Sequence, residues 1–201
     1  MRMPRRPQGA DVPARERILR AAERLFAEFG FQATPTSRIA EVAGVPKGLV
    51  HYHFRRKPDL LTALVERLPD ERVDLQRVVV RGDVAESLHR LVTELDGRLS
   101  ASRVLSHLLW READTHSVVR EALRQRYETL IAQVRAVILA AGVPARSPAD
   151  VDSASALVAR AVSYRHSVAR HTEEPEEMRR ELSLIASALE AKAGAAEPTG
   201  R

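Results

Sequence analysis

The chain has 201 residues, of which 44% are hydrophobic and 4% aromatic, a composition that suits one or two globular domains built mainly of helices. It contains no cysteine, which excludes a disulfide framework and thiolate chemistry. No apolar run approaches the ~18 residues of a membrane helix, and residues 1–12 lack the apolar stretch of a secretory signal. We therefore expect a cytoplasmic protein with no membrane partner.

The positive charge is concentrated at the start of the chain. Residues 1–59 contain 12 Lys/Arg and 6 Asp/Glu, a net charge of +6, whereas residues 60–201 contain 20 and 21, a net charge of −1. This asymmetry indicates a polyanion as the partner of the first segment. A basic surface that is only solvated is the alternative that the charge by itself leaves open.

The first elements are a tail and a long helix. Residues 1–12 carry two prolines, a glycine and three arginines without periodicity, so we expect a flexible basic arm. From Pro13 the apolar residues recur at helical spacing, and Gly30 suits the end of the helix. The expected buried stripe contains Ile18, Ala22, Leu25, Phe26 and Phe29.

Two short helices follow and are joined by a turn. Thr36 offers a capping hydroxyl to a helix of about residues 37–43, Gly44 ends that helix, and Pro46 opens the next one. This is the helix-turn-helix pattern, in which the second helix enters the major groove of DNA. The expected anchors of the second helix are Leu49, Val50 and Phe54. The positions left to point outward are Lys47, Gly48, His51, Tyr52 and His53.

The segment from about residue 14 to residue 68 resembles the DNA-binding domain of the tetracycline-repressor (TetR) family of bacterial transcription regulators. The motifs that carry the resemblance keep the family's order and spacing. They are residues 18–34, Ile-Ala-Glu-Val-Ala-Gly-Val-Pro-Lys-Gly at 39–48, His-Tyr-His-Phe at 51–54 and Lys-Pro-Asp-Leu-Leu at 57–61. The resemblance implies an all-α protein, with an N-terminal three-helix helix-turn-helix DNA-binding domain and a C-terminal helical domain for ligand binding and dimerisation.

The resemblance also assigns DNA contacts by position. In the recognition helix the matching positions are Lys47, Gly48, Leu49, His51, Tyr52 and His53. At the start of the supporting helix, which touches phosphates, they are Thr36, Ser37 and Arg38. Lys57 matches the lysine that holds a backbone phosphate at the start of the fourth helix. Phosphate contacts supply affinity but little sequence information, which comes from the recognition helix.

Two positions depart from the family's pattern. Leu49 stands where the family has Thr or Ser, and His51 stands where it has Tyr, so we expect a different operator sequence. Because histidine gains charge at mildly acid pH, we expect His51 and His53 to raise DNA affinity as the pH falls from about 8 to about 6. Operator affinity measured over that range at fixed salt tests this, and an unchanged affinity would contradict it.

Two other interpretations of the His-Tyr-His run remain open at this point. It can be a pair of metal ligands, although no cysteine or carboxylate flanks it at ligand spacing, so we expect no metal. Alternatively, Tyr52 can lie in the core, as aromatic rings on helices usually do.

The rest of the chain alternates helical stripes with breaks. Pro58 and Asp59 open a helix, and Pro69 ends or kinks it. Further apolar stripes include one with Val104, one that begins at Val118 and one with Leu157, and breaks fall at residues 142–144 and 172–175. The expected organisation is a basic arm (1–12), a helix-turn-helix domain (13–57), a connecting helix and linker (58–82), an effector-binding and dimerisation domain (83–193) and a tail (194–201).

The last two helices are separated by a short acidic turn, so we expect them to pack antiparallel. The resemblance implies that this pair forms a homodimer interface with its symmetry mate. A purely intramolecular core is the alternative.

The resemblance further implies a small-molecule effector, whose pocket would combine apolar walls with a few polar groups. The candidate residues are His107, Trp110, Arg111, Tyr127, Ser163, Tyr164 and Ser167. His107 and Arg111 flank the only tryptophan, a placement that suits an anionic ligand.

The expected function is a repressor that binds a quasi-palindromic operator in double-stranded DNA as a homodimer and is released by an effector. An activator is also compatible with the sequence. No Ser/His/Asp arrangement, paired-carboxylate motif, phosphate-binding loop or dinucleotide fingerprint is present, so we expect neither an enzyme nor a cofactor. A helical interaction protein that uses the basic segment on acidic partners is the remaining alternative.

Overall fold

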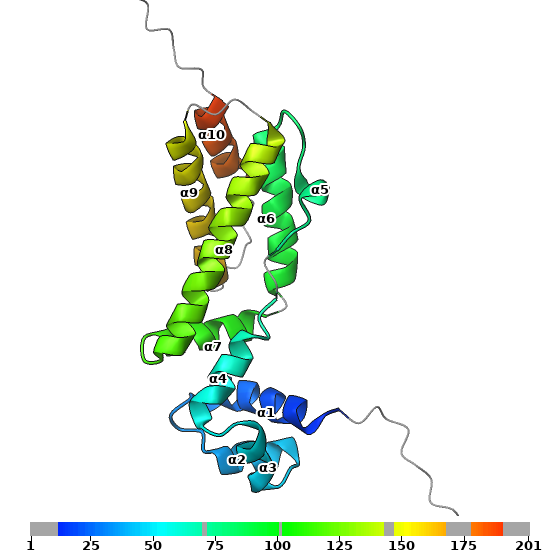
Figure 1. Ribbon diagram of the computed structural model, residues 1–201, viewed down its shortest axis with the longest axis vertical. Coiled ribbons are helices and arrows are strands. Elements are labelled where there is room, and N and C mark those ends of the chain that lie inside the picture. The colour runs from blue at the N-terminus through cyan, green and yellow to red at the C-terminus, as the bar shows by residue number, and fades with distance from the viewer. Residues whose placement is uncertain (1–11, 70–71, 101, 143–146, 168–177, 191–201) are drawn as a thin grey trace, which may run out of the picture. The chain divides into compact units, whose positions relative to one another are not determined.

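A computed structural model describes residues 12–69, 72–100, 102–142, 147–167 and 178–190 of the protein (Figure 1). These ranges consist of helices, turns and connecting segments, with an isolated β-bridge between Val80 and Asp83, so the predicted all-α class is confirmed. The chain divides into two compact units, Met1–Arg67 and Leu68–Arg201. This division falls inside the expected connecting segment 58–82, whose helix belongs with the first unit.

Several expectations concern residues outside these ranges. They are the basic arm apart from Val12, residues 143–144 of the break at 142–144, the break at 172–175 and the tail 194–201. Within the described ranges, no helix combines the length and the apolar character needed to cross a membrane.

The first unit is built around its longest helix. It contains α1 (Ala14–Phe29), α2 (Thr36–Ala43), α3 (Lys47–His53) and α4 (Lys57–Val65), and α1 contacts the other three. The buried face of α1 consists of Ile18, Leu19, Ala21, Ala22, Leu25 and Phe26. Phe29 is 40% exposed, so the prediction that it lies in the core is wrong.

The turn between α2 and α3 is sharp because Gly44 adopts left-handed backbone angles, with φ 62° and ψ 43°. The Gly44 N–H donates to the Glu41 carbonyl at 3.1 Å, and the Val45 N–H donates to the Ala40 carbonyl at 3.0 Å. These bonds satisfy the last carbonyls of α2, and a residue with a Cβ would be strained at this glycine. Pro46 then precedes α3, as the sequence predicts.

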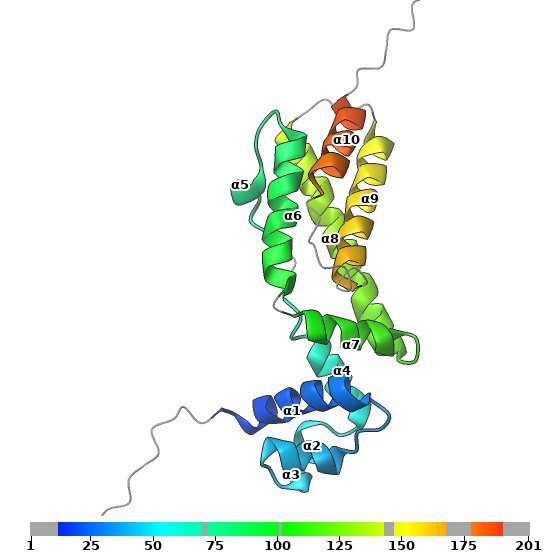
Figure 2. The same ribbon diagram turned by 180° about the vertical axis from the view of Figure 1, so that it is seen from behind.

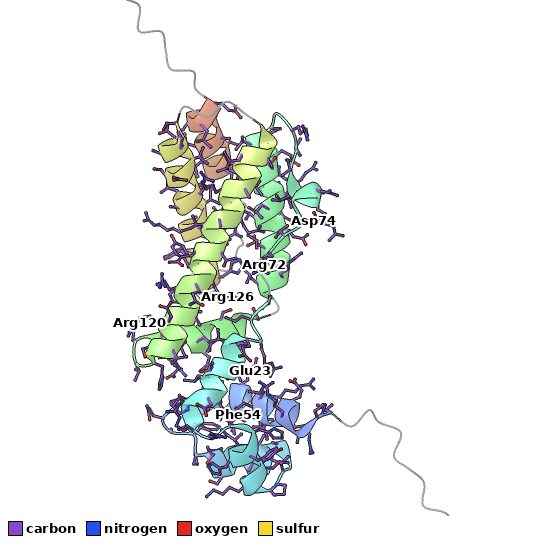
Figure 3. The ribbon with its side chains drawn as sticks, in the orientation of Figure 1. Glu23, Phe54, Arg72, Asp74, Arg120 and Arg126 are labelled. Atoms are coloured by element: carbon purple, nitrogen blue, oxygen red, sulfur yellow. The ribbon has the colours of Figure 1, made fainter. Side chains whose placement is uncertain are left out.

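The end of α4 is tied to α1 by ion pairs. Arg67 Nη2 lies 3.2 Å from Glu16 Oε1, and Arg67 Nη1 lies 3.3 Å from Glu23 Oε2 (Glu23 is labelled in Figure 3). All three side chains are about three-quarters buried, so these pairs are less screened by water than ordinary surface pairs. They fix the last residue of the first unit to its central helix.

The second unit is a helical bundle. It contains α5 (Leu75–Val78), α6 (Val84–Ser100), α7 (Arg103–Ala113), α8 (Ser117–Ala141), α9 (Pro148–Ser167) and α10 (Arg179–Glu190). Helices α6, α8, α9 and α10 run alongside one another, and α7 lies across the first part of α8 (Figures 1 and 2). Their facing stripes form one core, whose fully buried members include Leu88, Leu91, Leu95, Val134, Val137 and Val158.

Three apolar residues that the periodicity places in this core are exposed instead. Val104 is 62%, Val118 is 56% and Leu157 is 53% exposed, so these predictions are wrong. In α8 the buried position is taken by Val119, which shares a helix face with Leu123.

Candidate nucleic-acid interface and effector cavity

Helix α3 is held by two buried side chains and exposes the rest of its surface. Val50 is fully buried and Phe54, labelled in Figure 3, is 5% exposed, while Leu49 is half-buried. Two of the three predicted anchors are therefore fully packed. The positions that point to solvent are Lys47, Gly48, His51 and Tyr52, with His53 half-buried beside them.

Tyr52 is the most exposed large hydrophobic residue of the described chain, at 78%. The alternative that it lies in the core is therefore wrong. Its ring meets the His53 ring edge-on, with a centroid separation of 5.2 Å. At this exposure most of the Tyr52 side chain is available to a partner.

The start of α2 presents a supported cation. Thr36 is half-buried, whereas Ser37 and Arg38 are exposed. The Arg38 guanidinium lies 4.1 Å from the centroid of the Phe29 ring, a cation–π geometry. Phe29, which is 40% exposed, therefore contacts Arg38 at the surface instead of packing in the core.

Lys57 is held in place at the start of α4. Its Nζ donates to the Gln32 carbonyl at 3.2 Å and lies 4.5 Å from the centroid of the Phe31 ring. The backbone N–H of Arg56 donates to Asp59 Oδ2 at 2.9 Å, which caps α4. A lysine ordered in this way is pre-positioned to receive a phosphate oxygen.

Two arginines of α1 also contact the helix-turn-helix elements, and the sequence pattern does not predict these contacts. Arg17 Nη1 donates to the Gly44 carbonyl in the turn at 3.4 Å. The Arg15 guanidinium lies 5.5 Å from the centroid of the Phe54 ring. Both arginines are exposed. A charged residue on the outer face of a helix gives no indication in the sequence of which neighbouring element it contacts.

The family of this chain follows from residues 18–64, which run from α1 into α4. They match the sequence model described as "Bacterial regulatory proteins, tetR family". This chain belongs to the TetR family. The predicted recognition helix therefore lies inside the matched segment.

Similar proteins agree with this family beyond the matched segment. The HTH-type transcriptional regulator TtgR of Pseudomonas putida is 27% identical over 166 residues, which cover 78% of this chain and 79% of TtgR. The HTH-type transcriptional repressor BepR of Brucella suis is 36% identical over 89 residues, 43% of this chain and 42% of BepR. The solved structure of Salmonella enterica GusR has the same fold, with a TM-score of 0.66 and 23% identity over 92% of this chain and 99% of that one.

These relatives are transcriptional regulators rather than enzymes. This chain is accordingly a TetR-family helix-turn-helix transcriptional regulator and not an enzyme. Among the described residues, no group of three or more His, Cys, Asp or Glu is arranged to hold a metal ion, and the His51–His53 pair has no third ligand beside it.

A substitution at Gly48 tests whether the backbone of α3 comes close to DNA at this position. A Cβ added there would meet no protein atom within 4 Å. We expect Gly48→Ala to stabilise the folded chain by up to about 1 kcal/mol, since alanine is the better helix former. On DNA the added methyl would stand between α3 and the groove, so operator affinity should fall about tenfold. Thermal unfolding and fluorescence anisotropy on one duplex measure the two effects.

The matched control is Gly97→Ala in α6, where a Cβ also meets nothing within 4 Å. This change should raise stability similarly and leave operator affinity unchanged. Equal DNA affinities for Gly48→Ala and the wild type would remove Gly48 from the contact surface.

The second unit contains a cavity of about 60 Å³ between α6, α7, α8 and α9. Of the seven predicted effector-pocket residues, Trp110, Tyr127 and Ser163 line it. His107, Arg111 and Tyr164 are not in its lining, and Tyr164 is 61% exposed. The side chain of Ser167 lies outside what the structure describes.

Three further polar residues line the cavity, Ser106, Arg126 and His166. His166 Nε2 lies 2.8 Å from Asp96 Oδ1, and Arg165 Nη2 lies 3.0 Å from Asp96 Oδ2. Because a carboxylate only accepts hydrogen bonds, His166 Nε2 is the donor in its contact with Asp96.

Proposed function

We propose that this regulator is a repressor that binds a quasi-palindromic operator in double-stranded DNA as a homodimer and is released by a small-molecule effector. The main support for this proposal is the exposed face of α3, whose opposite side is anchored in the core by Val50 and Phe54. A helix held in this way can enter a major groove without disturbing the core beneath it. Two copies related by a two-fold axis would read half-sites about one helical turn apart, or a small multiple.

Charge and the names of relatives support DNA binding and repression. Residues 1–59 hold all of the excess positive charge, and the cations Arg38, Lys47 and Lys57 suit phosphate contacts. BepR and the AcnR of Corynebacterium glutamicum are both named HTH-type transcriptional repressors. A cytoplasmic location, where the operator is accessible, follows from the same proposal.

The dimer is proposed through α9 and α10, which pack against each other. These helices expose three large side chains with apolar surface, Leu157 (53%), Tyr164 (61%) and Leu184 (72%). Leu157 and Tyr164 are seven residues apart and so share one face of α9. Apolar surface of this kind on the last two helices suits a second copy of the same pair.

The test is capture of genomic fragments of the source organism by the purified full chain, followed by band shifts with the recovered sequence. We expect a quasi-palindrome that binds at moderate salt, whereas a scrambled duplex of the same length does not. A folded, dimeric protein that fails to discriminate between these duplexes would contradict the proposal and favour a binder of acidic partners.

A further inference from the structure

Arg126 of α8 both lines the cavity and holds the main chain that leaves the first unit. Its Nη2 donates to the carbonyl of Pro69, two residues after Arg67, where that unit ends (Arg126 is labelled in Figure 3). Leu68, the residue between them, also lines the cavity and is 8% exposed. A change in the cavity that moves Arg126 therefore acts on the chain next to the DNA-binding unit.

The main chain on either side of residues 70–71 is held by side chains rather than by secondary structure. Arg98 Nη1 donates to the Arg72 carbonyl at 2.7 Å, and the Val73 N–H donates to Gln133 Oε1 at 2.6 Å. Of these three hydrogen bonds, the one from Arg126 to Pro69 has a donor that also lines the cavity. A ligand in the cavity can therefore contact the donor of this bond.

The cavity wall suits an apolar ring that carries a negative charge. Most of the lining is apolar or aromatic, including Leu99, Leu130 and Trp110. The described lining contains the Arg126 guanidinium and no carboxylate. The nearby acid, Asp96, is already bonded to His166 and Arg165, so a cationic ligand would find no free counter-charge there.

The cavity is too small for such a ligand unless its wall moves. Its volume is about 60 Å³, whereas an apolar cavity known to hold benzene measures about 150 Å³. A ligand carboxylate carries a full negative charge and can accept two parallel bonds from a guanidinium, whereas the Pro69 carbonyl is neutral and accepts one from Arg126. It can therefore draw Arg126 away from Pro69 as it enters.

We propose that the effector is a small ring-bearing carboxylate, and that its binding moves Arg126 from the Pro69 carbonyl to the ligand. This rests on the proposed function in one respect, that the cavity is the effector site. The ligand prefers the opened state because the closed cavity cannot contain it, and that difference in affinity is what effector release requires.

The test uses benzoate, phenylacetate and phenylpropionate as probes, with phenylethylamine and phenylethanol as matched ring compounds of other charge. Trp110 is the only tryptophan and lines the cavity, so its fluorescence reports binding, and calorimetry gives the affinity. At least one carboxylate should bind saturably, and more tightly than either control compound. Arg126→Gln should weaken that binding at least about tenfold, as expected for a lost charge-assisted pair.

The control variant is Arg98→Gln, which removes a bond to the same main chain from a residue outside the cavity lining. It should leave carboxylate affinity unchanged. Hydrogen exchange at residues 72–75 should quicken when the carboxylate is added to the wild type, and in Arg126→Gln without ligand. If Arg126→Gln does not fold, Arg126→Lys keeps the charge without the planar fork and should show a smaller loss of affinity.

Failure of all three carboxylates to bind, or binding of the amine or alcohol at equal strength, would overturn the ligand class. Unchanged hydrogen exchange on carboxylate binding would overturn the displacement of Arg126. None of these measurements contains DNA, so each is separate from the operator experiment, whose failure would instead count against the repressor.

Discussion

Replacing Tyr52 by alanine is expected to weaken operator binding about a hundredfold while leaving the protein folded. The ring is 78% exposed at the centre of the proposed reading face, so its removal leaves no cavity in the core. Each half-site would lose a contact worth about 1–3 kcal/mol, and the dimer would lose two of them. Fluorescence anisotropy with the recovered operator measures the affinity, and thermal unfolding measures the stability.

Two further variants separate the contributions of Tyr52. Tyr52→Phe keeps the ring and removes the hydroxyl, so it should recover part of the affinity if the ring packs on sugar or a thymine methyl. Phe54→Ala is the contrast, because it removes a buried anchor of α3 and should cost about 3–5 kcal/mol of stability. A Tyr52→Ala protein that binds the operator as the wild type does would place the contact face elsewhere on α3.

Local chemistry made the helix-turn-helix predictable. Gly44 and Pro46 specify the turn through their backbone preferences, and α1 shows its buried face through helical spacing. The spacing placed Val50 among the anchors, where it is fully buried, and Tyr52 among the outward positions, but a core position for Tyr52 was excluded only by its 78% exposure. What it did not reveal was the contact of Arg38 with Phe29, because apolar periodicity cannot distinguish a core phenylalanine from one that supports a cation at the edge.

The cavity was less predictable because it depends on how each helix is rotated in the bundle. The sequence predicted Trp110 as a lining residue, and it lines the cavity, but its neighbours His107 and Arg111 do not. Adjacent residues on a helix point about 100° apart, so nearness in sequence does not place side chains on the same face. Arg126 lies within the polar run Arg-Gln-Arg at residues 124–126, where nothing in the pattern separates an inward-facing arginine from a solvated one. Only tertiary packing makes that distinction.

The exposed apolar residues of the second unit show the same limit. Leu157 fits the stripe of α9 by spacing, yet it is 53% exposed. Helical spacing shows that apolar residues share one face of a helix. It does not show whether that face packs against the same chain or against a second copy of the protein. This ambiguity is what a mutation on α10 can resolve.

Replacing Leu184 by arginine is expected to convert the proposed dimer to a monomer. Leu184 is 72% exposed on α10, so the folded single chain loses little by the change. In a dimer built on α9 and α10, two arginines would have to be buried without partners, which costs several kcal/mol. Sedimentation equilibrium should show one chain per particle, and circular dichroism should show unchanged helix content.

Loss of the dimer should lower operator affinity about a hundredfold or more, because the second reading head no longer binds at the high effective concentration set by the first. The control is Leu139→Arg, which places the same charge on α8 at a leucine that is 52% exposed. It should leave both the dimer and the operator affinity unchanged. If Leu184→Arg stays dimeric, Leu157→Arg on α9 repeats the test on the adjacent helix, and dimers from both variants would place the interface outside this helix pair.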